Sequence, residues 1–187
     1  MRCTWSVFKP VVAAFALSLI VTPPVWAQEA GADALLAELA NAPDAQAADR
    51  LERQIIDTWS RSGSPAMDVL LRRGRAALAV EDWDGAVRQF RALTDHAPDF
   101  AEGWHGLALS YYNTERFGPA MDALSRTLTL NPNHFGALRG VAAIHEQVDN
   151  PDLAYQAYTR VLALRPHDEI VEDAIARLER AVVGTAL

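Results

Sequence analysis

Five histidines are the side chains of this chain best suited to bind a metal ion or to transfer protons. None of them belongs to a His-Glu-x-x-His pair, and none stands four residues from another histidine. Two metal-binding histidines on one helix need that spacing in order to lie on the same face. The sequence therefore predicts no helical metal site. The five residues are His96, His105, His134, His145 and His167.

The residues needed for nucleophilic chemistry are missing as well. Cys3 is the only cysteine, and it stands ahead of an apolar run near the amino terminus. The chain has no Gly-x-Ser-x-Gly nucleophile elbow and no glycine-rich loop that would hold a phosphate. We therefore predict a protein that is not an enzyme, with no catalytic residue, no cofactor and no metal.

Residues 1–27 have the pattern of a secretory signal peptide. Arg2 and Lys9 give a positive start, an apolar run from Val11 to Val21 follows, and Val25-Trp26-Ala27 offers small residues before a cut after Ala27. The alternative is an uncleaved membrane anchor, but prolines bracket a stretch shorter than the roughly 20 apolar residues that a spanning helix needs. We expect cleavage and a periplasmic location.

The remaining chain is strongly acidic. The full sequence has a formal net charge of −7, and removal of Arg2 and Lys9 with the signal makes the rest more negative. Nucleic acids and anionic lipid surfaces bind clustered positive charge, and no basic tract is present. We expect neither as a partner, and we expect contact with a membrane only through an uncleaved signal.

The elements that position the side chains follow a period of 34 residues from residue 67 to residue 168. Three copies are predicted, at 67–100, 101–134 and 135–168, preceded by the helix-starting Pro65. The second copy carries Trp104, Leu107, Tyr111, Ala120, Leu124 and Pro132. The same places in the flanking copies hold Leu70, Arg73, Ala77, Ala86, Phe90 and Pro98, and then Leu138, Val141, His145, Ala154, Tyr158 and Pro166. This period is typical of paired antiparallel helices that stack.

Further helices are predicted on both sides of the repeats. Residues 28–64 form a helical pair and a linker, with a frayed leader over 28–32, one helix from Asp33 and a second from about Asp44 to Arg61. We expect this pair to cover the exposed end of the first repeat. Residues 169–187 form a capping helix with Ile170, Val171, Ala174, Ile175 and Leu178 on its apolar side. A dimerising or membrane-lying role for that helix is the alternative.

The repeat block resembles the tetratricopeptide repeat family. The second copy opens on Ala101-Glu102-Gly103-Trp104 and closes on Leu130-Asn131-Pro132-Asn133, close to the family pattern. The whole chain looks like the small exported tetratricopeptide proteins of alphaproteobacteria. The resemblance implies an all-α, right-handed superhelix of stacked helix pairs, whose concave groove is lined by the first helix of each pair.

Carrying the family's groove positions onto this chain gives a candidate peptide-binding site. Leu71, Gly106, Gly136 and Gly140 stand where some members carry a lysine-asparagine clamp for a carboxylate, so that clamp is not predicted. The sequence leaves two interpretations of the arginines open. They bind an acidic group on a peptide, or they pair with Asp68, Glu102 and Glu146 on the same surface. The candidate residues are Arg72, Arg75, His105, Leu109, Tyr112, Asn113, Arg139 and Glu146.

The predicted function is therefore binding. We expect a periplasmic adaptor, monomeric in solution, which holds a segment of an unknown protein or peptide in its groove. The alternative is a structural subunit of a cell-envelope complex that self-associates or docks through its convex face.

Overall fold

The computed structural model describes residues 25–185, with side chains described from residue 31 to residue 180. Over that range the secondary structure is helical throughout, as expected for an all-α fold. The predicted signal segment lies outside it except for Val25-Trp26-Ala27, and Cys3 lies outside it as well. The helices are α1 (Val25–Ala40), α2 (Ala45–Trp59), α3 (Pro65–Ala79), α4 (Trp83–His96), α5 (Ala101–Tyr112), α6 (Phe117–Leu130), α7 (Phe135–Gln147), α8 (Pro151–Leu164) and α9 (Glu169–Thr185).

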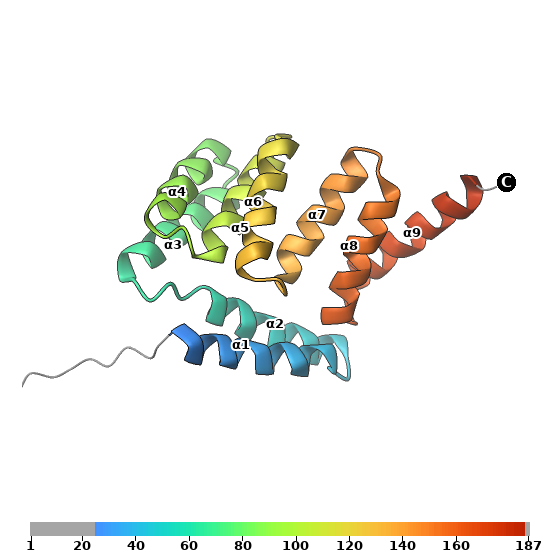
Figure 1. The fold of residues 1–187 in the computed structure, drawn as a ribbon, viewed down its shortest axis with the longest axis horizontal. Coiled ribbons are helices and arrows are strands. Elements are labelled where there is room, and N and C mark those ends of the chain that lie inside the picture. Colours follow the sequence, from blue (N-terminus) through green and yellow to red (C-terminus); the bar gives the residue numbers. More distant parts are fainter. Residues whose placement is uncertain (1–24, 186–187) are drawn as a thin grey trace, which may run out of the picture.

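Helices α3 to α8 form three antiparallel hairpins that stand side by side (Figure 1). The second helices of the hairpins begin at Trp83, Phe117 and Pro151, one period apart. The turn before each of them contains an acidic residue with a φ of 55–58°, again at one-period spacing: Glu81, Glu115 and Asp149. The same turn geometry, repeated at the same place, is the structural basis of the period seen in the sequence.

The hairpins approach closely because small residues stand where they cross. Ala86, Ala120 and Ala154, which share one place in the period, are all buried, and so are Ala108 and Ala142. Gly74 of α3 and Gly106 of α5 both face the ring of Phe90, and a Cβ on either would lie 2.6 Å or 2.2 Å from a ring carbon. Phe90 is fully buried between them. The packing of the first two hairpins therefore depends on one aromatic ring that packs against two glycines.

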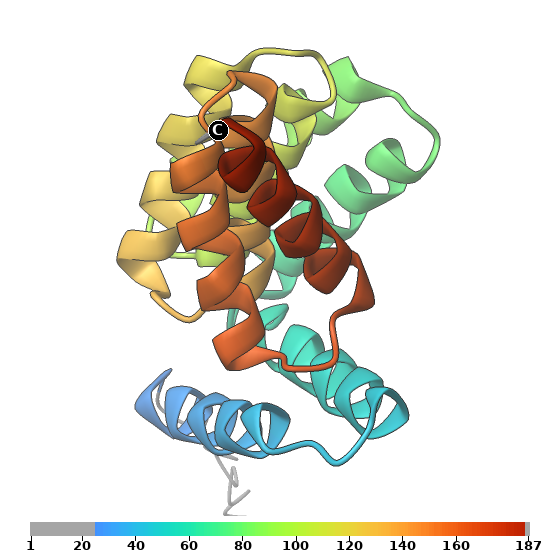
Figure 2. The same cartoon turned by 90° about the vertical axis from the view of Figure 1, so that its right-hand side faces the viewer.

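The amino-terminal pair does not lie where the sequence analysis placed it. Helix α1 begins at Val25, so residues 28–32 are helical and not a frayed leader. The α1–α2 hairpin lies crosswise beneath the stack (Figures 1 and 2). Its buried side chains share a core cluster with α7, α8 and α9, and among the described side chains that cluster has no member from α3 or α4. The expectation that the pair covers the first repeat was wrong, because its anchoring partners lie on the third.

The last helix, α9, packs on α8. Val171, Ala174 and Leu178 are buried, whereas Ile170, which was predicted on the apolar side, is 74% exposed. Asp168 lies just before the helix, and its carboxylate accepts a hydrogen bond from the Val171 amide at 3.3 Å. Of the helices in the described part of the chain, none is long and apolar enough to cross a membrane.

Candidate functional site

Two adjoining hollows of about 260 Å³ and 340 Å³ lie on the side of the repeats formed by α3, α5 and α7. Both are lined by His105, Leu109, Gly136 and Arg139. We call the smaller one the polar hollow and the larger one the apolar hollow. Because they share four residues, they form one continuous groove.

The apolar hollow lies between α5 and α7. Leu109 and Tyr112 of α5 line one side, and Ala143 and Ile144 of α7 line the other. Gly136 and Gly140 give α7 no side chain at two places along this wall. The full lining is His105, Ala108, Leu109, Tyr112, Leu124, Gly136, Arg139, Gly140, Ala143 and Ile144. A mostly apolar hollow with a few polar groups at its edge is the usual form of a binding site.

The polar hollow contains a buried hydrogen-bonded network centred on Glu102. The carboxylate of Glu102 accepts from His134 Nε2 at 3.0 Å and also pairs with Arg75. His134 in turn accepts the Ala137 amide proton on Nδ1 at 3.1 Å, and so caps the start of α7. The ring of His105 lies against that of His134, with 4.4 Å between their centroids. Glu102 and His134 are almost completely buried.

This environment shifts the pKa values of two groups downwards. Burial alone would raise the pKa of the Glu102 carboxyl. The hydrogen bond from His134 and the electrostatic attraction of His134, His105 and, least, Arg75 outweigh burial and lower the pKa to about 2. Burial, together with the neighbouring His134, lowers the pKa of His105 to about 3. At neutral pH Glu102 is therefore ionised and His105 is uncharged.

Glu102, His105 and His134 also bring their oxygen and nitrogen atoms within 4.8 Å of one another, which is close enough to consider a metal ion. The contacts of His134 favour a hydrogen-bonded network instead. Its Nδ1 accepts from Ala137, so the neutral ring carries its proton on Nε2, where a metal would need a lone pair. Arg75 on the other side of Glu102 adds positive charge next to the same position.

Three of the predicted site residues, His105, Leu109 and Arg139, line both hollows of the groove, and Arg75 lines the polar hollow only. Tyr112 lines the apolar hollow only. Arg72, Asn113 and Glu146 line neither hollow. Glu146 is turned toward the carboxyl-terminal helices, where it accepts from the Tyr158 hydroxyl and pairs with Arg177.

The groove arginines are engaged by buried carboxylates of the chain itself. Arg75 pairs with Glu102, one of the partners considered from the sequence, and its Nη1 donates to Ser60 at 2.8 Å. Arg139 pairs with Asp168, which is 1% exposed and lies in the turn after α8. Asp68, another partner considered, instead accepts from Ser62. An incoming acidic group would have to share Arg75 and Arg139 with these carboxylates.

The sequence analysis missed the contribution of α2 to this site. Glu52, Ile56 and Trp59 line the polar hollow from the side opposite α5 and α7. Ile56 and Trp59 were recognised as part of one buried helical stripe, but nothing in their spacing indicated which surface covers them. The groove is therefore bounded at this end by the chain's own amino-terminal hairpin.

Fold and site together define a helical-repeat protein with an open concave groove. Residues 71–135 match the family model described as tetratricopeptide repeat. A tetratricopeptide-repeat-containing protein of Rhizobium etli, an alphaproteobacterium, is 26% identical over 152 residues, covering 81% of this chain and 74% of the relative. The comparisons therefore support tetratricopeptide repeats in this chain, with the family match over residues 71–135.

Solved structures show the same fold. The first tetratricopeptide domain of Spaghetti (RPAP3), solved with an HSP90 peptide, matches with a TM-score of 0.60 at 20% identity, over 63% of this chain and 93% of that domain. MamA matches with a TM-score of 0.59 at 16% identity, over 72% of this chain and 82% of its own. Proteins of this fold are protein-interaction scaffolds, which agrees with the predicted class of function.

Proposed function

We propose that this chain is an exported adaptor of the bacterial periplasm that holds a segment of a partner protein in its concave groove and performs no catalysis. The observation that carries the proposal is the apolar hollow between α5 and α7, which stands open beside Leu109 and Tyr112. Tetratricopeptide neighbours such as the Spaghetti domain were solved with a peptide, which supports a peptide-like ligand here.

Apolar anchors, more than arginines, carry the proposed recognition. Arg75 and Arg139 each already neutralise a buried carboxylate, and an unpaired buried carboxylate would be costly. Tyr112 does not neutralise a buried carboxylate. Its ring centroid lies 5.7 Å from that of Phe117, and the residue borders the apolar hollow. Tyrosine is over-represented among the residues that contribute most to binding.

Blocking the apolar hollow tests the proposal. In Ala143→Lys a long charged side chain enters the apolar hollow, whereas Ser125→Lys adds the same group to an exposed position on α6. We expect Ala143→Lys to reduce capture of partner proteins from envelope extract at least tenfold, and Ser125→Lys to leave capture unchanged. Equal capture by both variants would exclude the groove as the working surface.

The periplasmic location rests on the signal pattern of residues 1–27. With a tag at the carboxyl terminus, the protein should appear in the periplasmic fraction with a mass that corresponds to cleavage after Ala27. Recovery in the cytoplasm at full mass would contradict this part of the proposal.

A further inference from the structure

Helix α2 occupies one end of the groove as a ligand would. Its three groove-facing residues, Glu52, Ile56 and Trp59, line the polar hollow. Their spacing of four and then three residues places them on one face of the helix. An acidic, an aliphatic and an aromatic side chain therefore follow one another along the contact.

The aromatic end of this face is the most specific contact. The ring of Trp59 stacks on His134, with 4.8 Å between centroids and 23° between ring planes, and it also meets Phe135 at 5.1 Å. His134 is in turn fixed by Glu102 and by the Ala137 amide. Trp59 thus lies on a surface that the repeats hold rigid.

The acidic end is held by one arginine of the repeats. Arg165, at the end of α8, pairs with Glu52 through Nε at 2.8 Å and with Asp49 through Nη2 at 2.7 Å. Its Nη1 also pairs with Asp168 at 3.0 Å, and only 13% of its side chain is exposed. Two carboxylates of α2 therefore meet a positive charge that the repeats orient.

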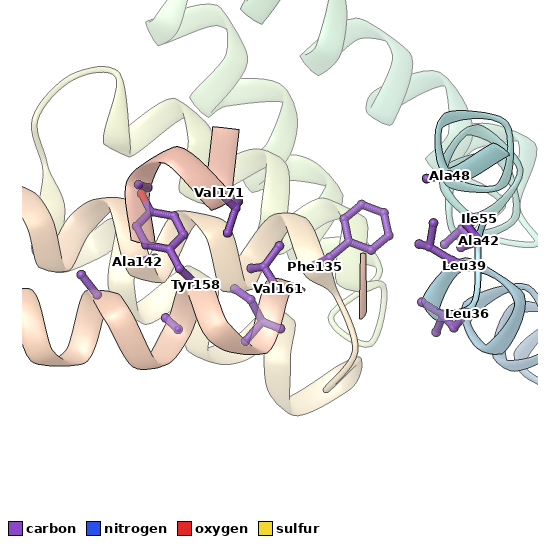
Figure 3. Close-up of a cluster of buried hydrophobic side chains, with 14 of the residues drawn as sticks. Leu36, Leu39, Ala42, Ala48, Ile55, Phe135, Ala142, Tyr158, Val161 and Val171 are labelled. Atoms are coloured by element: carbon purple, nitrogen blue, oxygen red, sulfur yellow. The ribbon is translucent and has the colours of Figure 1, made fainter. Parts of the chain in front are cut away.

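The α1–α2 hairpin contributes one side of an apolar core that it shares with α7, α8 and α9. Figure 3 shows one group of side chains gathered between α1 and α2, apart from those of α7 to α9, with Phe135 between the two groups. The labelled residues of the hairpin are Leu36, Leu39, Ala42, Ala48 and Ile55. Residues 60–64, which include Gly63 with a φ of 77°, join it to α3. The hairpin therefore meets the repeats through ring contacts and ion pairs as well as through the apolar core that it shares with α7, α8 and α9.

We propose that the groove selects an amphipathic helix with an acidic, an aliphatic and an aromatic side chain at positions i, i+4 and i+7, and that α2 is an internal copy of this ligand which the partner helix displaces. This inference rests on the proposed function and names the chemistry of the partner. The acidic side chain of the partner pairs with Arg165, and its aromatic side chain stacks on His134. Because α2 is tethered, its effective concentration is on the order of millimolar, so only a ligand that reproduces its contacts will compete.

A peptide of α2 itself is the direct probe. A fluorescent peptide of residues 44–61 is titrated with the full chain and with the full chain carrying Ile56→Ala and Trp59→Ala. These changes remove two side chains of the tethered helix from the polar hollow and leave the groove residues of α5 and α7 unchanged. We expect the double variant to bind the peptide at least tenfold more tightly than the wild type. The same peptide with Trp59→Ala should lose at least tenfold in affinity for the double variant.

Two further variants keep the result interpretable. Glu52→Gln in the chain changes one partly exposed side chain, so the protein should fold normally and show a smaller gain in peptide affinity. Arg165→Gln removes the contact that the tethered helix and the peptide share, so it should give no gain in peptide affinity. A gain with Arg165→Gln as large as with Glu52→Gln would overturn the assignment of Arg165.

Equal peptide affinity for wild type and double variant, or no binding to either, would overturn the inference. Formation of a dimer by the double variant would also overturn it, in favour of exchange of the hairpin between two copies. If the peptide does not bind but Ala143→Lys still reduces capture from envelope extract, the proposed function stands and only the preference for this helix is overturned. If both fail, the groove has no assigned ligand.

Discussion

Replacing Phe90 with alanine is expected to lower the free energy of unfolding by about 3–5 kcal/mol, the usual range for deleting a buried aromatic side chain. Phe90 is 0% exposed, and its ring fills the space over Gly74 of α3 and Gly106 of α5. Neither glycine has a side chain that can move into the cavity, so little relaxation is possible. Urea unfolding followed by circular dichroism measures the loss.

The same contact gives a control and a stricter test. Phe117→Ala removes a ring that is only partly buried, and it should cost clearly less. Gly106→Ala alone should be destabilising, because the new Cβ would lie 2.2 Å from a ring carbon of Phe90. Combined with Phe90→Ala, the same methyl group partly fills the cavity, so the two losses should sum to more than the loss in the double variant. Additive losses would show that the ring does not lie between α3 and α5.

Glu102→Ala is expected to lower the free energy of unfolding by about 1–3 kcal/mol, because it leaves a buried hydrogen-bond donor without its acceptor. His134 Nε2 would lose its acceptor in a site where the ring is 3% exposed. Glu102→Gln keeps an acceptor for His134 and removes only the charge, so it should be milder. The matched control is Asp99→Ala, since the carboxylate of Asp99 is 89% exposed and 3.9 Å from Arg126. A loss for Glu102→Ala no greater than for Asp99→Ala would contradict the network.

The lowered pKa values of His105 and Glu102 predict how the stability of the fold depends on pH. The pKa of His105 is about 3 in the folded chain and 6.5 in the reference state. The unfolded chain therefore binds an extra proton between these values, and stability falls as the pH drops from about 6.5 toward 3. Glu102, with a pKa of about 2 against 4.5, adds a second loss as the pH drops from about 4.5 toward 2. His105→Asn should remove the first loss and Glu102→Gln the second, as measured by urea midpoints across this range.

The repeat part of the fold was predictable because its information is local and periodic. Trp83, Phe117 and Pro151 occupy one place in the period, and each begins the second helix of a hairpin. Ala86, Ala120 and Ala154 likewise occupy one place in the period, and all three are buried. Leu109 and Tyr112 were assigned to the groove from what the family resemblance implies, and both line the apolar hollow.

The position of α2 and the pairing of the arginines could not be read in this way. Trp59 meets His134, and Glu52 meets Arg165, across separations in the sequence that no period connects. Arg139 finds its carboxylate in Asp168, outside the groove surface on which its partners were sought. Each of these contacts depends on how the amino-terminal hairpin and the last turn dock on the finished stack, which is a tertiary property.

The central claim, that a partner segment occupies the groove between α5 and α7, is tested most directly by placing a photo-reactive amino acid at Leu109 in the apolar hollow or at Ser125 on the exposed side of α6. Irradiation in cells followed by mass analysis identifies what each position touches. The account predicts adducts with one partner segment from position 109 and none from position 125. Adducts from position 125 with none from position 109 would contradict it.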